Sequence, residues 1–280
     1  MDRFKSKLIG AVLSGVLLAV VSGQVFAQEK EERKTKETVA MSQQVYEKLA
    51  EIQESIEGKD YASAQRAIDE LKVRKGLSDY ERAQIYNINA YSYYLQERYA
   101  DAIKAYDQVL AQPGLPEALL LSTLKTKAQL HFTQEDYESA LKVVRQLLAA
   151  IPEPSPDVLM IEGQALFQLT RYDEALVPIK TAIDMYREQG QTPKENWLLL
   201  LRVIYFEQTE YALTIGVVNE LIAYDPKDTY ILTLAGIYSE LGDTKKQLAL
   251  TEVLYEKGML NTASHITNLA NLYLLHGLPY

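Results

Sequence analysis

The chain has 280 residues, a formal net charge of −9 and no cysteine. The lack of cysteine excludes disulfides, thiolate metal sites and a lipid-bearing N-terminal cysteine. The acidic balance argues against nucleic acid or anionic lipid as a partner, because both need a basic surface, and it is compatible with a basic partner protein.

Residues 1–27 have the three parts of an export signal. Basic residues come first, residues 8–21 are apolar, and Val25, Phe26 and Ala27 form a small-residue cleavage site. The apolar run of about 14 residues is shorter than the roughly 20 that a membrane span needs, so we expect cleavage near Ala27 rather than an uncleaved anchor. Removal of this segment, with its three basic residues and one acidic residue, leaves a net charge of −11. The signal predicts a periplasmic protein of a Gram-negative bacterium that does not span the membrane.

Residues 28–39 are almost entirely polar and are predicted to form a flexible tether, with a docking tail as the less favoured interpretation. Residues 40–280 are predicted to form one array of about six helical repeats and an incomplete seventh. The seventh repeat has a first helix around Leu269, and the sequence stops at Tyr280, where its second helix is expected. We interpret this as truncation or, less favoured, as an open end that self-associates or meets another chain.

A short signature recurs along this array: an aromatic residue, two variable residues and a small residue. Its copies are Tyr61–Ala64, Tyr99–Ala102, Tyr137–Ala140, Tyr172–Ala175, Tyr211–Thr214 and the degenerate Thr244–Gln247. Their spacing of 33 to 39 residues, with apolar residues three and four positions apart, is typical of stacked helix pairs. Such an array buries its apolar faces only by stacking neighbouring repeats, which leaves a long surface suited to binding.

Four helix starts are marked by cap-forming residues, two in the spacing of a capping box and two directly before a proline. The capping-box pairs are Ser78–Glu81 and Thr192–Glu195, and the proline pairs are Ser155–Pro156 and Asp225–Pro226. No alternation of apolar and polar residues of the β type has a useful length. The sequence therefore predicts an all-α fold.

Residues 234–243 (LAGIYSELGD) resemble the tetratricopeptide repeat family. In that family the first helix of each repeat has a small residue at its eighth position and an aromatic residue at its eleventh. The pairs that fit, in varying degree, are Ala90–Tyr93, Ala128–His131, Gly163–Leu166, Ala235–Tyr238 and Ala270–Tyr273. Small residues let helix backbones approach closely, so we expect looser contacts at Arg202 and Gln247, which break the pattern. The resemblance implies a right-handed superhelical solenoid of antiparallel helix pairs.

A narrower resemblance runs from about residue 40 to the end of the chain. The segments that carry it are residues 45–49 (VYEKL), 193–197 (PKENW), 199–201 (LLL), 238–242 (YSELG) and 245–249 (KKQLA). They are similar to the exported repeat proteins encoded beside TonB, ExbB and ExbD in marine and related proteobacteria. The resemblance implies a periplasmic accessory to energised outer-membrane uptake of iron chelates, with envelope proteins of the TonB/ExbB/ExbD type as partners and no catalytic residues.

Residues that would carry catalysis are scarce. The three histidines are His131, His265 and His276, and His131 falls at a position where the repeats pack an aromatic ring. The chain has no HExxH pattern, phosphate-binding glycine loop or nucleophile elbow. We therefore predict no enzyme activity, no metal site and no cofactor.

The best binding candidates lie on the first helices. The twelfth position carries a ring in four consecutive repeats, namely Tyr94, Phe132, Phe167 and Phe206, and the fifth and ninth positions add Asn87, Tyr91, Lys125, Gln129, Met160 and Gln164. In the family these positions usually face the concave groove, where rings supply contact area and amides hydrogen-bond a partner's backbone. The alternative is that position twelve is core. We favour core for Phe206 and weigh the two interpretations equally for the other three rings.

Some members of the family clamp a C-terminal carboxylate with lysine and asparagine side chains. Lys125 occupies one of these positions, but Gln129 and Ile161 stand where the asparagines are expected. The sequence therefore does not predict a carboxylate clamp.

The favoured function is a periplasmic adaptor that binds another envelope protein, in a TonB-type energy-transduction system. A second hypothesis is a scaffold for outer-membrane or cell-wall assembly. A third, from another class, is the non-catalytic part of a truncated envelope hydrolase whose catalytic domain lies beyond Tyr280.

Overall fold

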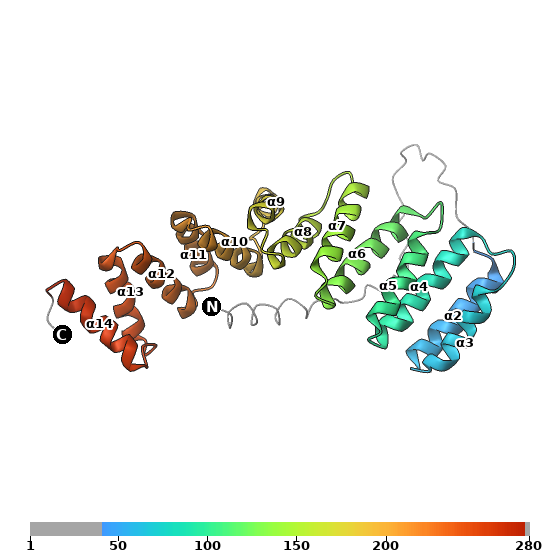
Figure 1. The fold of residues 1–280 in the computed structure, drawn as a ribbon, viewed down its shortest axis with the longest axis horizontal. Coiled ribbons are helices and arrows are strands. Elements are labelled where there is room, and N and C mark those ends of the chain that lie inside the picture. The colour runs from blue at the N-terminus through green and yellow to red at the C-terminus, as the bar shows by residue number, and fades with distance from the viewer. Residues whose placement is uncertain (1–40, 278–280) are drawn as a thin grey trace.

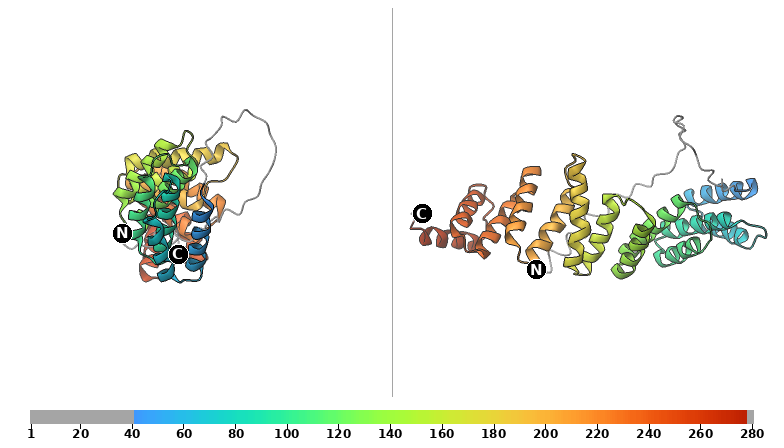
Figure 2. Two further views of the ribbon diagram at one scale, coloured as in Figure 1. Left: turned by 90° about the vertical axis from the view of Figure 1, so that its right-hand side faces the viewer. Right: turned by 90° about the horizontal axis from the view of Figure 1, so that it is seen from above.

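The computed structural model describes residues 41–277, which form thirteen helices and no strand. The helices follow one another in a single elongated array, from α2 at one end to α14 at the other (Figure 1). The view from above shows successive helix pairs stacked side by side along the long axis (Figure 2). The predicted export signal and tether lie outside the described residues, as do residues 278–280. No described helix is long and apolar enough to cross a membrane.

Each repeat has a first helix with an even number and a second helix with an odd number. The first helices are α2 (Gln43–Glu57), α4 (Asp79–Leu95), α6 (Glu117–Thr133), α8 (Pro156–Gln168), α10 (Glu195–Glu207), α12 (Asp228–Glu240) and α14 (Ala263–Leu275). The second helices are α3 (Tyr61–Lys72), α5 (Tyr99–Leu110), α7 (Tyr137–Ala150), α9 (Tyr172–Glu188), α11 (Tyr211–Tyr224) and α13 (Thr244–Glu256). Short turns join the two helices of a pair and make them antiparallel. The predicted all-α solenoid is confirmed.

Small residues set how closely the paired helices pack. The alanines of the recurring signature, Ala64, Ala102, Ala140 and Ala175, have no exposed surface. In α8, a Cβ atom added to Gly163 would lie 2.4 Å from Cγ1 of Ile179 in α9, so only glycine fits this approach. Arg202 occupies the same position in α10, and α10 packs less closely on α11 than α8 does on α9. The looser contact expected at Arg202 is therefore observed.

The turns within the pairs share one backbone geometry. The residue after the helix cap has a positive φ between 56° and 60° in five turns, at Lys59, Glu97, Glu135, Thr170 and Thr209. In one example the N–H of Thr170 donates to the carbonyl of Phe167 at 2.9 Å. The N–H of Arg171 donates to the carbonyl of Leu166, also at 2.9 Å. This is the Schellman helix end, which glycine normally occupies, and a β-branched threonine is strained there.

The capping box predicted at the start of α4 is confirmed. The N–H of Glu81 donates to Oγ of Ser78 at 3.2 Å, and the N–H of Ser78 donates to Oε2 of Glu81 at 2.8 Å. The other carboxylate oxygen of Glu81 accepts from the N–H of Ser42 at 2.9 Å and from its hydroxyl at 2.6 Å. Ser42 is the N-cap of α2, so one buried carboxylate serves the starts of two neighbouring first helices. Burial alone would raise the pKa of Glu81, but the hydrogen bonds from Ser42 and Ser78 lower it to about 2.

The capping box predicted at Thr192 and Glu195 is wrong. Glu195 is the first residue of α10, and its carboxylate accepts hydrogen bonds from the side chains of Lys227 and Tyr230 in the next repeat. These hydrogen bonds lower the pKa of Glu195. The side chain of Glu195, which the local pattern assigns to a cap, therefore binds the next repeat instead.

Two further helix starts test the prediction of a cap before proline. α8 begins at Pro156 after Ser155, as predicted, although the Ser155 side chain makes no capping hydrogen bond. The start of α12 is displaced, because the helix begins at Asp228 with Lys227 as its N-cap rather than at the predicted Asp225.

The hydrophobic core is continuous in the middle of the array and divided toward its ends. One cluster of buried side chains runs from α6 to α12. Separate clusters lie in α2–α4, in α4–α6 and in α12–α14. α4, α6 and α12 each contribute to two clusters, so neighbouring repeats share a helix across every division.

Candidate protein-binding surface

Four first helices end in a ring that packs on the tyrosine at the start of the second helix of the same repeat. The distances between ring centroids are 6.1 Å for Tyr94–Tyr99, 5.7 Å for Phe132–Tyr137, 5.5 Å for Phe167–Tyr172 and 5.8 Å for Phe206–Tyr211. The four pairs are tilted or edge-on, which are the favoured arrangements of aromatic side chains. We call Tyr94, Phe132, Phe167 and Phe206 the ring ladder, because the same turn geometry places each ring against its tyrosine.

The rings of the ladder differ in exposure. Tyr94, Phe132 and Phe167 are partly buried and pack against the core clusters, whereas Phe206 is 42% exposed. Position twelve is thus neither wholly core nor wholly groove, since each ring contacts its own repeat and keeps some open surface. The preference for core at Phe206 is wrong. Arg202 lies one turn earlier on the same stripe of α10 as the exposed Phe206 ring.

The polar candidates of the first helices have no hydrogen-bonding partner among the described residues. Asn87, Gln129 and Gln164 are half-buried, as is Tyr91, and Lys125 is exposed. Among residues 41–277, the side chains of Asn87, Lys125, Gln129 and Gln164 make no hydrogen bond and no ion pair. Their donors and acceptors are therefore available to another molecule.

Met160 is a correction to the predicted set. Its side chain is 2% exposed and belongs to the largest core cluster. α8 contacts α7, α9 and α10, and these neighbours enclose its fifth position. Met160 therefore stabilises the core and offers no surface to a partner.

A buried tyrosine of α5 lies beneath two candidate residues of α4, Tyr91 and Tyr94. Tyr106 of α5 lies near Tyr91 and Tyr94 and is 6% exposed. Burial first, and then the neighbouring tyrosines, raise the pKa of Tyr106 to about 12. Its hydroxyl stays neutral at physiological pH, and its ring forms part of the base on which Tyr94 rests.

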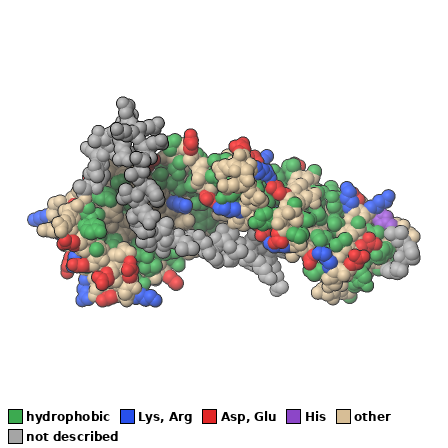
Figure 3. All heavy atoms as spheres, turned by 180° about the vertical axis from the view of Figure 1, so that it is seen from behind, with side chains coloured by type: hydrophobic (Ala, Val, Ile, Leu, Met, Phe, Trp, Pro, Cys, Tyr) green, Lys and Arg blue, Asp and Glu red, His purple; other side chains and the backbone are tan. Residues whose placement is uncertain are grey.

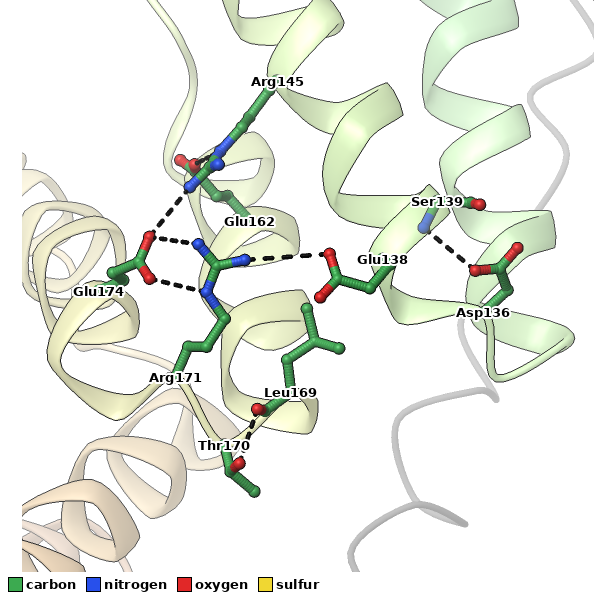
Figure 4. Close-up of polar contacts among 9 residues, drawn as sticks. All are labelled: Asp136, Glu138, Ser139, Arg145, Glu162, Leu169, Thr170, Arg171 and Glu174. Atoms are coloured by element: carbon green, nitrogen blue, oxygen red, sulfur yellow. Dashed lines mark hydrogen bonds and ion pairs between the residues drawn. The ribbon is translucent and has the colours of Figure 1, made fainter.

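An ionic network joins two neighbouring repeats through α7, α8 and α9 (Figure 4). Nη2 of Arg171 lies 2.6 Å from Oε2 of Glu174, and its Nη1 lies 3.9 Å from Oε2 of Glu138. Arg145 of α7 contacts Glu162 at 3.0 Å and Glu174 at 3.4 Å. The hydrogen bond from Arg171 lowers the pKa of Glu174. The charges are solvated, so the ion pairs add little stability. We infer that their role is to help fix the position of one repeat relative to the next.

Charged side chains do not gather into one patch on the face shown in Figure 3. Acidic and basic groups are interspersed along the array there, with hydrophobic side chains between them. This pattern offers many small contacts rather than one strong electrostatic attraction.

The described residues hold little that suits chemistry. Residues 41–277 contain no group of three His, Asp or Glu side chains that could bind a metal ion. His131 is half-buried, its Nδ1 lies 3.3 Å from Oδ2 of Asp136, and burial lowers its pKa. A hollow lined by Gln44, Lys48 and Arg74, among others, is open to solvent.

Two family models match parts of the chain. The model described as tetratricopeptide repeat matches residues 49–116. The model described as anaphase-promoting complex, cyclosome, subunit 3 matches residues 95–182. Together with the fold, these matches confirm the resemblance to tetratricopeptide repeats. No curated protein is similar enough in sequence to match the chain.

Solved structures of repeat proteins have the same fold. A tetratricopeptide repeat protein from Parabacteroides merdae ATCC 43184 has a TM-score of 0.54 at 17% identity, covering 84% of this chain and 88% of that chain. The YrrB protein has a TM-score of 0.51 at 15% identity, covering 67% of this chain and 88% of its own. The MamA protein has a TM-score of 0.50 at 19% identity, covering 63% of this chain and 95% of its own. At these identities the likeness shows the fold alone.

Proposed function

We propose that this chain, an array of tetratricopeptide repeats, is a protein-binding scaffold that holds a segment of a partner protein along its first helices. The observation that carries the proposal is the row of unpaired polar side chains beside the ring ladder. Asn87, Lys125, Gln129 and Gln164 come from three successive first helices and have no partner among the described residues. Unpaired groups that recur with the repeat suit a ligand that extends along several repeats.

The ring ladder gives this surface its rigidity. Each ring packs on a tyrosine of its own repeat, so little side-chain freedom remains to be lost when a partner binds. The neighbouring amides can donate to and accept from the backbone of an extended segment. One structure of similar fold, YrrB, is described as a tetratricopeptide repeat protein with an unusual peptide-binding site, which supports this use of the fold.

The proposed location is the periplasm, and the proposed partners are envelope proteins of a TonB/ExbB/ExbD-type system. The export signal at residues 1–27 and the resemblance to repeat proteins encoded beside that system support this assignment. The proposal involves no reaction catalysed by the chain itself.

A photoreactive amino acid in place of Lys125 tests the surface directly. Lys142 is the matched control, because it is also an exposed lysine but lies on the second helix α7. In cells of the source bacterium grown under iron limitation, we expect a covalent adduct with an envelope protein from position 125 and none from position 142. The adduct is identified by mass spectrometry.

The same experiment contradicts the proposal in either of two ways. Equal adducts from both positions would mean that the first helices are not the binding surface. An adduct with an outer-membrane or cell-wall assembly factor, and none with a TonB-type component, would keep the scaffold and replace the proposed system.

A further inference from the structure

Arg202 stands where the first helices α4, α6, α8 and α12 have a small side chain. The residues at this register position in the neighbouring first helices are Ala90, Ala128, Gly163 and Ala235. In α8 the position faces the second helix, since a Cβ on Gly163 would lie 2.4 Å from the Ile179 side chain. The side chain of Arg202 therefore starts at the register position that faces the second helix, and the residue as a whole is partly exposed.

The guanidinium of Arg202 has no partner among the described residues. Its Nε is inaccessible to solvent and has no hydrogen-bond acceptor, and no carboxylate forms an ion pair with it. Burial lowers the pKa of Arg202, and the nearby Tyr230 of α12 acts against this shift. An unpaired charge that is largely removed from water is costly, so proteins rarely retain one without a counter-ion.

An open aromatic ring lies next to this cation. Phe206 follows Arg202 by four residues, so the two side chains share one stripe of α10. Phe206 is the most exposed ring of the ladder, and Leu232 of the next first helix is 38% exposed. An arginine without an ion-pair partner and exposed apolar side chains therefore occur in the same region, at the most exposed ring of the ring ladder.

We propose that Arg202 binds the carboxylate of an acidic side chain in the partner protein, while Phe206 contacts an apolar side chain beside it. The planar fork of arginine matches a carboxylate with two parallel hydrogen bonds, and the Phe206 ring favours a peptide over a free anion. The inference rests on the proposed function and adds the chemistry of the partner, an acidic residue next to an apolar one. The site lies on α10, separate from the clamp position occupied by Lys125.

The test uses the full chain labelled with ¹⁵N-arginine, and it follows the Nε–H signal of Arg202 by NMR. The probes are the blocked dipeptide acetyl-Leu-Glu-amide, its neutral match acetyl-Leu-Gln-amide, and inorganic phosphate. We expect a saturable shift with the Glu peptide, with a dissociation constant on the order of 1 mM. The Gln peptide should bind about tenfold more weakly or worse, because the charge-assisted hydrogen bonds are lost.

Two variants separate binding from folding. Arg202→Met should abolish the difference between the two peptides and raise the midpoint of thermal unfolding, because it removes an unpaired cation from the helix interface. Arg145→Met, which deletes an exposed and ion-paired arginine, should leave the binding of both peptides unchanged.

Three outcomes would overturn the inference. Equal shifts with both peptides would remove the role of the carboxylate, and an equal saturable shift with phosphate would make the occupant a free anion. A lower unfolding midpoint in Arg202→Met, with peptide binding intact, would make the residue purely structural. The adduct from position 125 distinguishes these failures from failure of the scaffold, because it persists in Arg202→Met if only the acidic contact is wrong.

Discussion

The repeats α8–α9 and α10–α11 are neighbours built on one plan, and they differ at one decisive position. Both have the same positive-φ turn, at Thr170 and Thr209, and both place a ring on the tyrosine after it. In α8 the register position before the ring is Gly163, and the helices meet closely, whereas in α10 it is Arg202, and they do not.

We infer from this difference that the residue at this register position influences both the packing of the helix pair and the exposure of its ring. With glycine, the two helices close on Ile179, and the ring at Phe167 is partly buried. With arginine, α10 and α11 have fewer close backbone contacts, and the ring at Phe206 is exposed. A solenoid of this kind can therefore vary its surface repeat by repeat without changing its backbone plan.

The largest expected effect comes from copying the α10 residue into α8. Gly163→Arg places a bulky, charged side chain against Ile179, which has no exposed surface, and should lower the free energy of unfolding by about 4 kcal/mol or more. Urea denaturation followed by circular dichroism measures this loss. The control is Gly236→Arg, because nothing lies within 4 Å of a Cβ there, and its effect should be small. Similar losses in both variants would disprove the packing argument.

The next effect concerns the two rings. Phe167→Ala should cost about 3 kcal/mol of unfolding free energy, whereas Phe206→Ala, at a ring that is 42% exposed, should cost about 1 kcal/mol. The same denaturation experiment compares them. If the two substitutions lower the free energy of unfolding equally, the greater exposure of Phe206 is contradicted.

A third test extends the comparison to α4, where the glutamate of the helix start caps its own helix and also binds the N-cap Ser42 of the preceding repeat. Glu81→Gln should lower the free energy of unfolding at pH 7 by about 2 kcal/mol, because three hydrogen bonds lose their charged acceptor. Denaturation at pH 7 measures the loss, with the exposed first-turn acid of α6, in Glu117→Gln, as the control.

The pH dependence of the parent chain follows from the same carboxylate. The pKa of Glu81 is about 2 in the folded chain, below its ordinary value of 4.5. Its contribution is therefore complete above about pH 4.5 and is lost as the pH falls toward 2. Glu81→Gln should flatten the fall in stability over this window, and an unchanged pH profile would contradict the assignment.

The smallest effect should be equal in the two repeats. Thr170→Gly and Thr209→Gly should each raise the free energy of unfolding by about 0.5 to 1 kcal/mol, because glycine relieves the positive φ of a β-branched residue. Thr181→Gly, at an exposed position inside α9, should instead lower it. If the two variants gained different amounts of unfolding free energy, the turns themselves would contribute to the difference between the two repeats.

Local patterns were sufficient to predict the fold. The tyrosine and alanine of each signature marked the second helices, because a close helix contact needs a small residue at a fixed position. The same pattern marks Arg202 as a departure, because arginine is too large for that position. Local patterns were insufficient at Thr192 and Asp225, because Lys194 and Lys227 reach acids of the preceding repeat and shift the helix starts.

The candidate surface was predicted in outline and wrong in detail. Asn87, Lys125, Gln129 and Gln164 keep open polar groups, but Met160 is buried and Phe206 is exposed. Neither reversal is visible in the register alone, since both depend on how closely neighbouring helices approach. One signal was overlooked, namely a second ring five residues after each ladder ring, which stacks across the turn.

The divided core also determines how the molecule comes apart. Because α4, α6 and α12 are shared between adjacent clusters, each is a seam at which one end of the array can melt while the rest stays intact. Backbone amides of α2–α3 and of α13–α14 should then exchange with deuterium as two separate groups, ahead of those in α7–α11. Under tension the chain would lengthen in steps that end at these seams.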